Sequence, residues 1–170
     1  MKTYLKTGLF FAILLTVVSL SAPVADAAQW IKVDEIKIDA DKNVSPMDYS
    51  FGQRSAPTRL ELGTLKNLYG NGAGFIIYID TSEQRGKWLS FKVDSGTLSA
   101  RIVGQPGGIV SFPPSTISNN DPLVLEIRDD VLTISAGKMR RTVNGVYGFS
   151  GSMTTQSIET TLKVFNWQED

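Results

Sequence analysis

The sequence predicts an all-β protein, folded as a single-domain antiparallel β-sandwich of jelly-roll type, with a closed β-barrel as the alternative. Stretches in which apolar and polar residues alternate with a period of two recur between Trp30 and the end of the chain, as in strands with one buried face. No long segment of this part places apolar side chains at helical three-four spacing. Turn-forming residues recur about every eight to fifteen positions, as between the short strands of a sandwich. The length of 170 residues fits one domain.

Residues 1–27 have the features of a cleavable secretory signal. Lys2 and Lys6 precede an apolar run of 13 residues at 8–20, and residues 25–27 fit the small-x-small cleavage rule. The run is shorter than a bilayer-spanning helix, so we expect cleavage rather than a membrane anchor. The mature protein, residues 28–170, is therefore expected to be exported to a periplasm or outside the cell and not to span a membrane. The style of the signal indicates a bacterial source.

The first half of the mature chain contains three predicted strands and a long loop. In order, we expect a strand at Trp30–Ile38, a loop at Asp39–Pro57, a strand followed by a turn at Arg59–Tyr69, and a strand at Phe75–Asp80. The first strand changes phase across Asp34-Glu35, which predicts a β-bulge. The loop is polar and interrupted by proline and glycine, whereas the dense apolar run of the last strand suits the middle of a sheet.

The second half contains two predicted hairpins. In order, we expect the hairpin Trp88–Ile102 with its turn at Ser95-Gly96, an edge strand at Ile109–Phe112, the hairpin Leu123–Ala136 with its turn at Asp129-Asp130, a strand at Lys138–Val143, a loop at Gly148–Ser157 and a strand at Ile158–Trp167. Alternation on both sides of a turn predicts each hairpin. The loop is predicted from its glycine, serine and threonine content. The second hairpin loosely resembles those of concanavalin-like and laminin-G-like sandwiches, a likeness that carries no site residue across.

The composition excludes several kinds of chemistry. The chain has no cysteine and no histidine, so it forms no disulfide, no Ser-His-Asp triad, and no metal site built on imidazole or thiolate. Lysine plus arginine and aspartate plus glutamate both count 17, which leaves no strong field to attract nucleic acid. Nucleic acid is therefore not an expected partner.

Five residues in the outer phase of their strands form the predicted ligand-binding surface. They are Tyr78, Trp88, Arg101, Glu126 and Arg128. We expect them to share one sheet face, where flat rings would stand beside charged hydrogen-bonding groups. A glycan-binding face requires this mixture, and a polar protein interface uses it as well. In the alternative interpretation, Trp88 is buried beneath the segment 111–121 and Tyr78 packs against a neighbouring strand.

The sharpest local pattern is Asp39-x-Asp41-x-Asn43, followed by Asp48. Alternate carboxylate and amide side chains in a loop offer the oxygen ligands that calcium prefers. The loop lacks the glycine at position six and the glutamate at position twelve of an EF-hand. The preferred interpretation is a strand-terminating loop whose side chains bond nearby backbone, and a calcium site is the alternative.

Three hypotheses of function remain open at this point. The leading one is a non-enzymatic, exported module that binds a glycan or a surface protein. The second is a structural envelope or extracellular subunit that forms homo-oligomers through its sheet edges. The third is a glycoside hydrolase acting through carboxylates such as Asp80 and Glu126. Trp30 and Trp167 are expected to pin the terminal strands, because loose chain ends fray.

Overall fold

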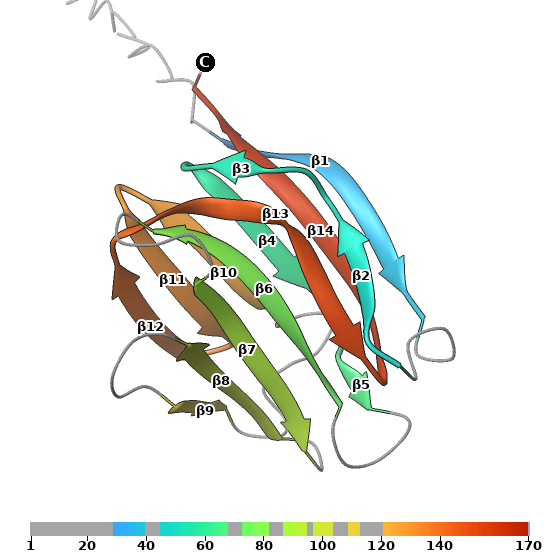
Figure 1. Ribbon diagram of the computed structural model, residues 1–170. Helices are drawn as coiled ribbons and strands as arrows, with labels where there is room; N and C mark the ends of the chain where they lie inside the picture. The colour runs from blue at the N-terminus through green and yellow to red at the C-terminus, as the bar shows by residue number, and fades with distance from the viewer. Residues whose placement is uncertain are drawn as a thin grey trace, which may run out of the picture.

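Two antiparallel sheets lie face to face in the computed structural model, which describes residues 29–39, 45–67, 73–81, 87–94, 97–103, 109–112 and 121–169 (Figure 1). Sheet A contains, in spatial order, β1 (Gln29–Ile38), β14 (Ile158–Gln168), β4 (Thr58–Leu62), β10 (Leu123–Arg128), β11 (Val131–Ala136) and β12 (Met139–Asn144), with the short β5 (Lys66–Asn67) on β14. Sheet B contains β2 (Met47–Ser50), β13 (Val146–Gln156), β6 (Gly74–Thr81), β7 (Lys87–Asp94), β8 (Thr97–Val103) and β9 (Ile109–Phe112), with the short β3 (Arg54–Ser55) on β13. The sandwich prediction is confirmed, and the barrel alternative is wrong, because the described strands form two separate sheets, each with two edge strands. None of the described segments forms a helix long and apolar enough to cross a membrane.

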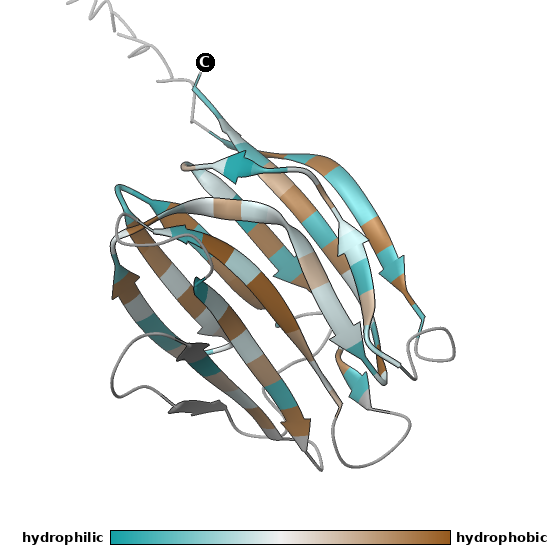
Figure 2. Ribbon diagram, viewed as in Figure 1, coloured by the Kyte–Doolittle hydropathy of each residue, from teal (hydrophilic) through white to brown (hydrophobic). Residues whose placement is uncertain are grey.

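The core lies between the two sheets and is filled mainly by alternate apolar side chains of the inner strands. Figure 2 shows this alternation as hydrophobic and hydrophilic bands along the ribbons. Buried and partly exposed residues alternate through β10 and through β6 as far as Asp80, as the sequence pattern predicts. Leu60 and Leu125 from sheet A and Ile77 and Leu89 from sheet B are fully buried. Burying each such side chain contributes about 1.5–3 kcal/mol to the stability of the fold. The remaining side chains of each strand therefore point outward and are available for a site.

The strand pairing of both predicted hairpins is confirmed, with regular registers in β7–β8 and β10–β11, while the predicted turn at Ser95-Gly96 lies outside the described residues. Asp129 and Asp130 have φ angles of 46° and 60°, which fit a two-residue turn whose twist matches that of the strands. The predicted bulge in the first strand is present, but it lies between Lys32 and Asp34, just before the expected position. Strand β6 lies inside sheet B and β9 at its edge, also as predicted.

The predicted loop at Gly148–Ser157 is wrong, because most of this segment belongs to β13, which lies between β2 and β6 inside sheet B. Phe149 and Met153 of this strand are fully buried. The glycines have a packing role: a Cβ at Gly148 would lie 2.3 Å from a backbone oxygen of β3. Gly151 has a φ of +94° where the strand bulges between Phe149 and Met153. These glycines are therefore explained by the close approach of a neighbouring backbone, and not by a loop.

The predicted loop Asp39–Pro57 is also partly wrong, because it contains β2 and β3. Both strands pair with β13 and are too short to produce a recognisable alternation in the sequence. Strand β2 is mostly exposed, and Phe51, which follows it, is buried against Phe149 with ring centroids 6.5 Å apart. These two short strands exist because they pair with the long strand β13, and the sequence does not reveal this pairing.

The four outer strands have features that discourage pairing with another chain. Strands β2 and β9 have four residues each, and β1 is interrupted by its bulge. Strand β12 carries Arg140 and Arg141, both exposed. Short, bulged and basic edges are typical of sheets that do not aggregate through their edges. The edges therefore give little support to self-assembly by strand addition.

Candidate functional site

The five predicted ligand-binding residues lie on opposite outer faces of the sandwich. Tyr78, Trp88 and Arg101 belong to β6, β7 and β8 of sheet B, whereas Glu126 and Arg128 belong to β10 of sheet A. The expectation that they share one face is therefore wrong. Alternation determines whether a side chain points inward or outward, but it does not determine which sheet a strand joins.

On sheet B, Tyr78 and Trp88 are direct neighbours across β6 and β7. Their ring centroids lie 6.4 Å apart with an interplanar angle of 58°, and both residues are half-buried. Arg101 is exposed and lies opposite Ser90, two positions along the strand from Trp88. Tyr78 packs across the strands against Trp88, as the alternative interpretation expected for Tyr78, whereas most of the segment 111–121 expected to cover Trp88 lies outside the described residues. Ligand binding at this surface stays a prediction.

On sheet A, Glu126 and Arg128 belong to a larger group of outward side chains, which we call the arginine-tryptophan cluster. Its members are Trp30 of β1, Phe165 and Trp167 of β14, Arg59 and Glu61 of β4, and Glu126 and Arg128 of β10. These four strands are adjacent in sheet A, and Phe165, Arg59 and Glu126 lie side by side in one cross-strand row. Segments from both ends and the middle of the chain therefore build one surface.

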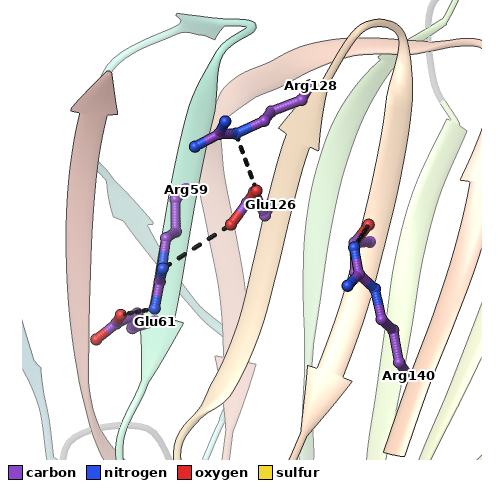
Figure 3. A network of polar contacts seen from close by, with 6 residues as sticks. Arg59, Glu61, Glu126, Arg128 and Arg140 are labelled. Atoms are coloured by element: carbon purple, nitrogen blue, oxygen red, sulfur yellow. Dashed lines mark hydrogen bonds and ion pairs between the residues drawn. The ribbon is translucent and has the colours of Figure 1, made fainter. Parts of the chain in front are cut away.

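Glu126 lies at the centre of a chain of ion pairs (Figure 3). Its Oε1 is 3.0 Å from Nε of Arg128, and its Oε2 is 3.8 Å from Nη1 of Arg59. The Nη2 of Arg59 also donates a hydrogen bond to Glu61. The four side chains are only 18% to 39% exposed, so solvent screens these charges less than it screens a fully exposed pair. The network therefore holds both guanidinium groups in defined positions.

The aromatic rings orient the same two arginines. Trp30 and Trp167 meet edge to face with centroids 5.1 Å apart, and the guanidinium carbon of Arg128 lies 3.7 Å from the Trp167 centroid. Arg59 lies 5.8 Å from the Phe165 centroid, within the range of a cation–π contact. The terminal amino groups of Arg128 form no hydrogen bond within the described part of the chain. They are donors that a ligand can use without rearranging the site.

The tryptophan pair also agrees with the expected anchoring role. Trp30 and Trp167 are direct partners between β1 and β14, the first and last described strands. One ring contact thus joins the two terminal strands and supports the stack that positions Arg128.

A groove of about 270 Å³ adjoins the cluster on the same face and is lined by Glu35, Glu61, Gly63, Pro122, Thr161 and Lys163. Glu61 belongs to both the groove and the ion-pair network. The pKa of the Glu35 carboxyl is lowered, mainly because Lys32 donates a hydrogen bond of 2.7 Å to it and carries a positive charge beside it. The positive charges of Lys163 and Lys37 lower this pKa further. Groups of both charges therefore line a surface recess next to the aromatic rings.

The predicted calcium pattern falls partly outside the described residues, since Asp41 and Asn43 are not among them. Asp39 follows β1, and Asp48 in β2 accepts a hydrogen bond of 2.5 Å from the Thr154 hydroxyl. Within the described ranges, no three acidic side chains gather as metal ligands would. The calcium site stays a prediction.

The two acids named for a hydrolase cannot act on one bond. Asp80 lies on the outer face of sheet B, where it accepts hydrogen bonds from Ser150 at 2.8 Å and Gln53 at 3.3 Å. Glu126 lies on the outer face of sheet A. A glycosidase needs its two carboxyl groups on either side of the same glycosidic bond. This pair therefore gives no support to the hydrolase hypothesis.

Comparisons with known proteins yield only distant structural likenesses. No family model and no curated protein sequence matches the chain. Among solved structures, the galectin LEC-6 of Caenorhabditis elegans is 13% identical with a TM-score of 0.47, over 78% of this chain and 95% of its own. CG-16, a homodimeric agglutinin from chicken liver, is 5% identical with a TM-score of 0.45, over 73% and 100%. An alginate lyase from Alteromonas sp. 272 is 10% identical with a TM-score of 0.36, over 80% and 79%.

Likenesses of this size assign the chain to no family and carry no function. By its own fold, the chain is an antiparallel β-sandwich protein. By its own side chains, one sheet face carries a cluster of paired charges and aromatic rings beside a groove.

Proposed function

We propose that the protein is an exported, non-enzymatic module that binds a glycan on the outer face of sheet A, at the arginine-tryptophan cluster. The observation that carries this proposal is the position of Arg128, which is held by Glu126 on one side and Trp167 on the other. Export rests on the secretory features of residues 1–27, which lie outside the described residues.

The chemistry of the cluster suits sugars. Pyranose rings present apolar faces to aromatic side chains and hydroxyl groups to charged donors and acceptors. Trp30 and Trp167 supply half-buried aromatic surface, and Arg128 supplies oriented donors beside it. Because the ion pairs and stacks already fix these groups, binding loses little side-chain entropy. A preorganised polar site of this kind favours recognition of a small set of hydroxyl geometries.

The test begins with a glycan array carrying plant, animal and bacterial oligosaccharides, probed with the mature protein, residues 28–170. The best oligosaccharide is then titrated by calorimetry against Glu126→Gln and Arg128→Lys. Glu126→Gln removes the charge that holds both arginines, and Arg128→Lys keeps the charge but loses the planar group stacked on Trp167. We expect each variant to weaken binding about tenfold or more, the loss of one charge-assisted hydrogen bond.

Two further variants make the result specific to this face. Arg141→Lys is the matched control for Arg128→Lys. Arg141 is exposed on β12 and belongs neither to the arginine-tryptophan cluster nor to the surface at Tyr78 and Trp88. Trp88→Phe tests the competing surface on sheet B. The proposal is wrong if no glycan binds, if binding falls only in Trp88→Phe, or if Glu126→Gln binds as tightly as the unmodified protein. Capture of a protein ligand with no glycan on either partner would favour the protein-binding alternative instead.

A further inference from the structure

The outer face of sheet A offers more room than the arginine-tryptophan cluster occupies. Along β14 the outward side chains are, in order, Trp167, Phe165, Lys163, Thr161 and Glu159. The first two belong to the cluster, the next two line the groove of about 270 Å³, and the last lines a second cleft. One strand thus passes beneath all three features.

The second cleft has a volume of about 500 Å³ and lies where β1, β14 and β5 meet. It shares Gly63 and Thr161 with the smaller groove, so the two recesses lie next to each other. The recess has a simple cause in the sequence. Gly63 has no side chain, Thr161 has a short one, and the hydrogen bond of 3.0 Å from the Gly63 amide to the Thr161 carbonyl holds the two side by side. Long side chains are missing from the outer face at this position.

The stretch of this face from the arginine-tryptophan cluster to the second cleft is long compared with a single sugar unit. Trp167 and Glu159 are separated by eight residues of extended chain, which corresponds to about 26 Å at the rise of a β-strand. A monosaccharide or disaccharide covers only the part next to the aromatic rings. The far end is lined by polar groups of both charges, including Lys37, Lys66 and Glu159, which are partners for hydroxyl groups.

We infer that the ligand is an extended oligosaccharide chain of several sugar units, lying along β14 from the tryptophan pair to the cleft at Lys66 and Glu159. This inference rests on the proposed function and names its substrate class. The rings bind one end of the segment, the groove at Thr161 binds its middle, and the charged cleft binds its other end. Both recesses lie at the surface of sheet A, so an internal stretch of a polymer can bind there as well as a free oligosaccharide.

The experiment is a chain-length series of the glycan found on the array, from disaccharide to hexasaccharide, titrated by calorimetry. We expect the affinity to rise with each added unit until the recess is filled, by about tenfold or more in total. Equal affinity of the disaccharide and the hexasaccharide would overturn the inference while leaving the proposed function intact. Absence of binding by any member would overturn both.

A variant that blocks the groove at Thr161 provides a second test of the inference. In Thr161→Arg, the long side chain can pair with Glu35 on the groove wall, which is not a member of the cluster, and so cover the groove. We expect this variant to bind the hexasaccharide about as weakly as the disaccharide, with unchanged disaccharide binding. Thr142→Arg is the matched control, because Thr142 is exposed on β12 outside the recess. If Thr161→Arg retains full affinity for the hexasaccharide, the ligand does not pass over this part of the face.

Discussion

Replacing Gly151 by alanine tests β13, the element that differs most from the sequence prediction. At its φ of +94°, alanine is less stable than glycine by about 1–2 kcal/mol. The new Cβ would lie 2.5 Å from the backbone nitrogen of Gln53 and 2.5 Å from the carbonyl carbon of Gly52. Backbone atoms cannot rotate away as a flexible side chain can, so the segment beside β13 must shift. That shift weakens the hydrogen bond of 2.9 Å from the Phe51 amide to the Gly151 carbonyl, worth about 1 kcal/mol.

We therefore expect Gly151→Ala to lower the free energy of unfolding by about 2–5 kcal/mol, the sum of the conformational effect and an overpacking effect of about 1–3 kcal/mol. In a domain of this size the thermal midpoint should fall by about 10 °C, measured by circular dichroism. Gly145→Ala is the matched control: Gly145 has a φ of +74°, but nothing lies within 4 Å of the added Cβ. It should lose only about 1–2 kcal/mol. Equal shifts in the two variants would refute the packing of β13 described above.

Four other predictions concern the site, the edges and export. A double-mutant cycle of Arg59→Met and Glu126→Gln should give a coupling energy of about 1 kcal/mol in urea unfolding, and additive effects would contradict the ion pair. Trp167→Ala should destabilise the protein by about 2 kcal/mol and speed hydrogen exchange in β1, because it removes a half-buried ring that contacts Trp30. Size-exclusion chromatography at rising concentration should show a monomer, since the sheet edges are short, bulged or basic; a growing oligomer would favour the assembly hypothesis. Mass spectrometry of the exported protein should find a mature start near Ala28, and an intact residue 1 would contradict cleavage.

Strands that pair with their neighbour in sequence through a short turn could be predicted from the sequence. In the hairpin Leu123–Ala136 the pairing partner lies only a few residues away, so alternation and two turn-forming aspartates suffice to predict its register. The loop predicted at Gly148–Ser157 fails for the opposite reason. Its pairing partners, β2, β3 and β6, are distant in the sequence, and its glycines meet the steric demands of those partners.

The candidate site could be predicted only in part. Alternation correctly placed Glu126 and Arg128 on an outer face, but it grouped them with Trp88, which lies on the other sheet. Arg59 and Glu61 were missed, although the antiparallel register places the positive charge of Arg59 directly opposite Glu126. That signal is useful only once β4 and β10 are known to be neighbours.

The amino-acid sequence alone therefore determines the β class, the inward and outward phases of most strands, the hairpins and the absence of thiol and imidazole chemistry. These properties depend on local geometry, because side chains alternate along any strand and tight turns need particular residues. The order of strands in the two sheets was decided by the tertiary structure. Burial of both apolar faces depends on contacts between distant segments, and that packing brings Trp30, Arg59, Glu126 and Trp167 onto one surface.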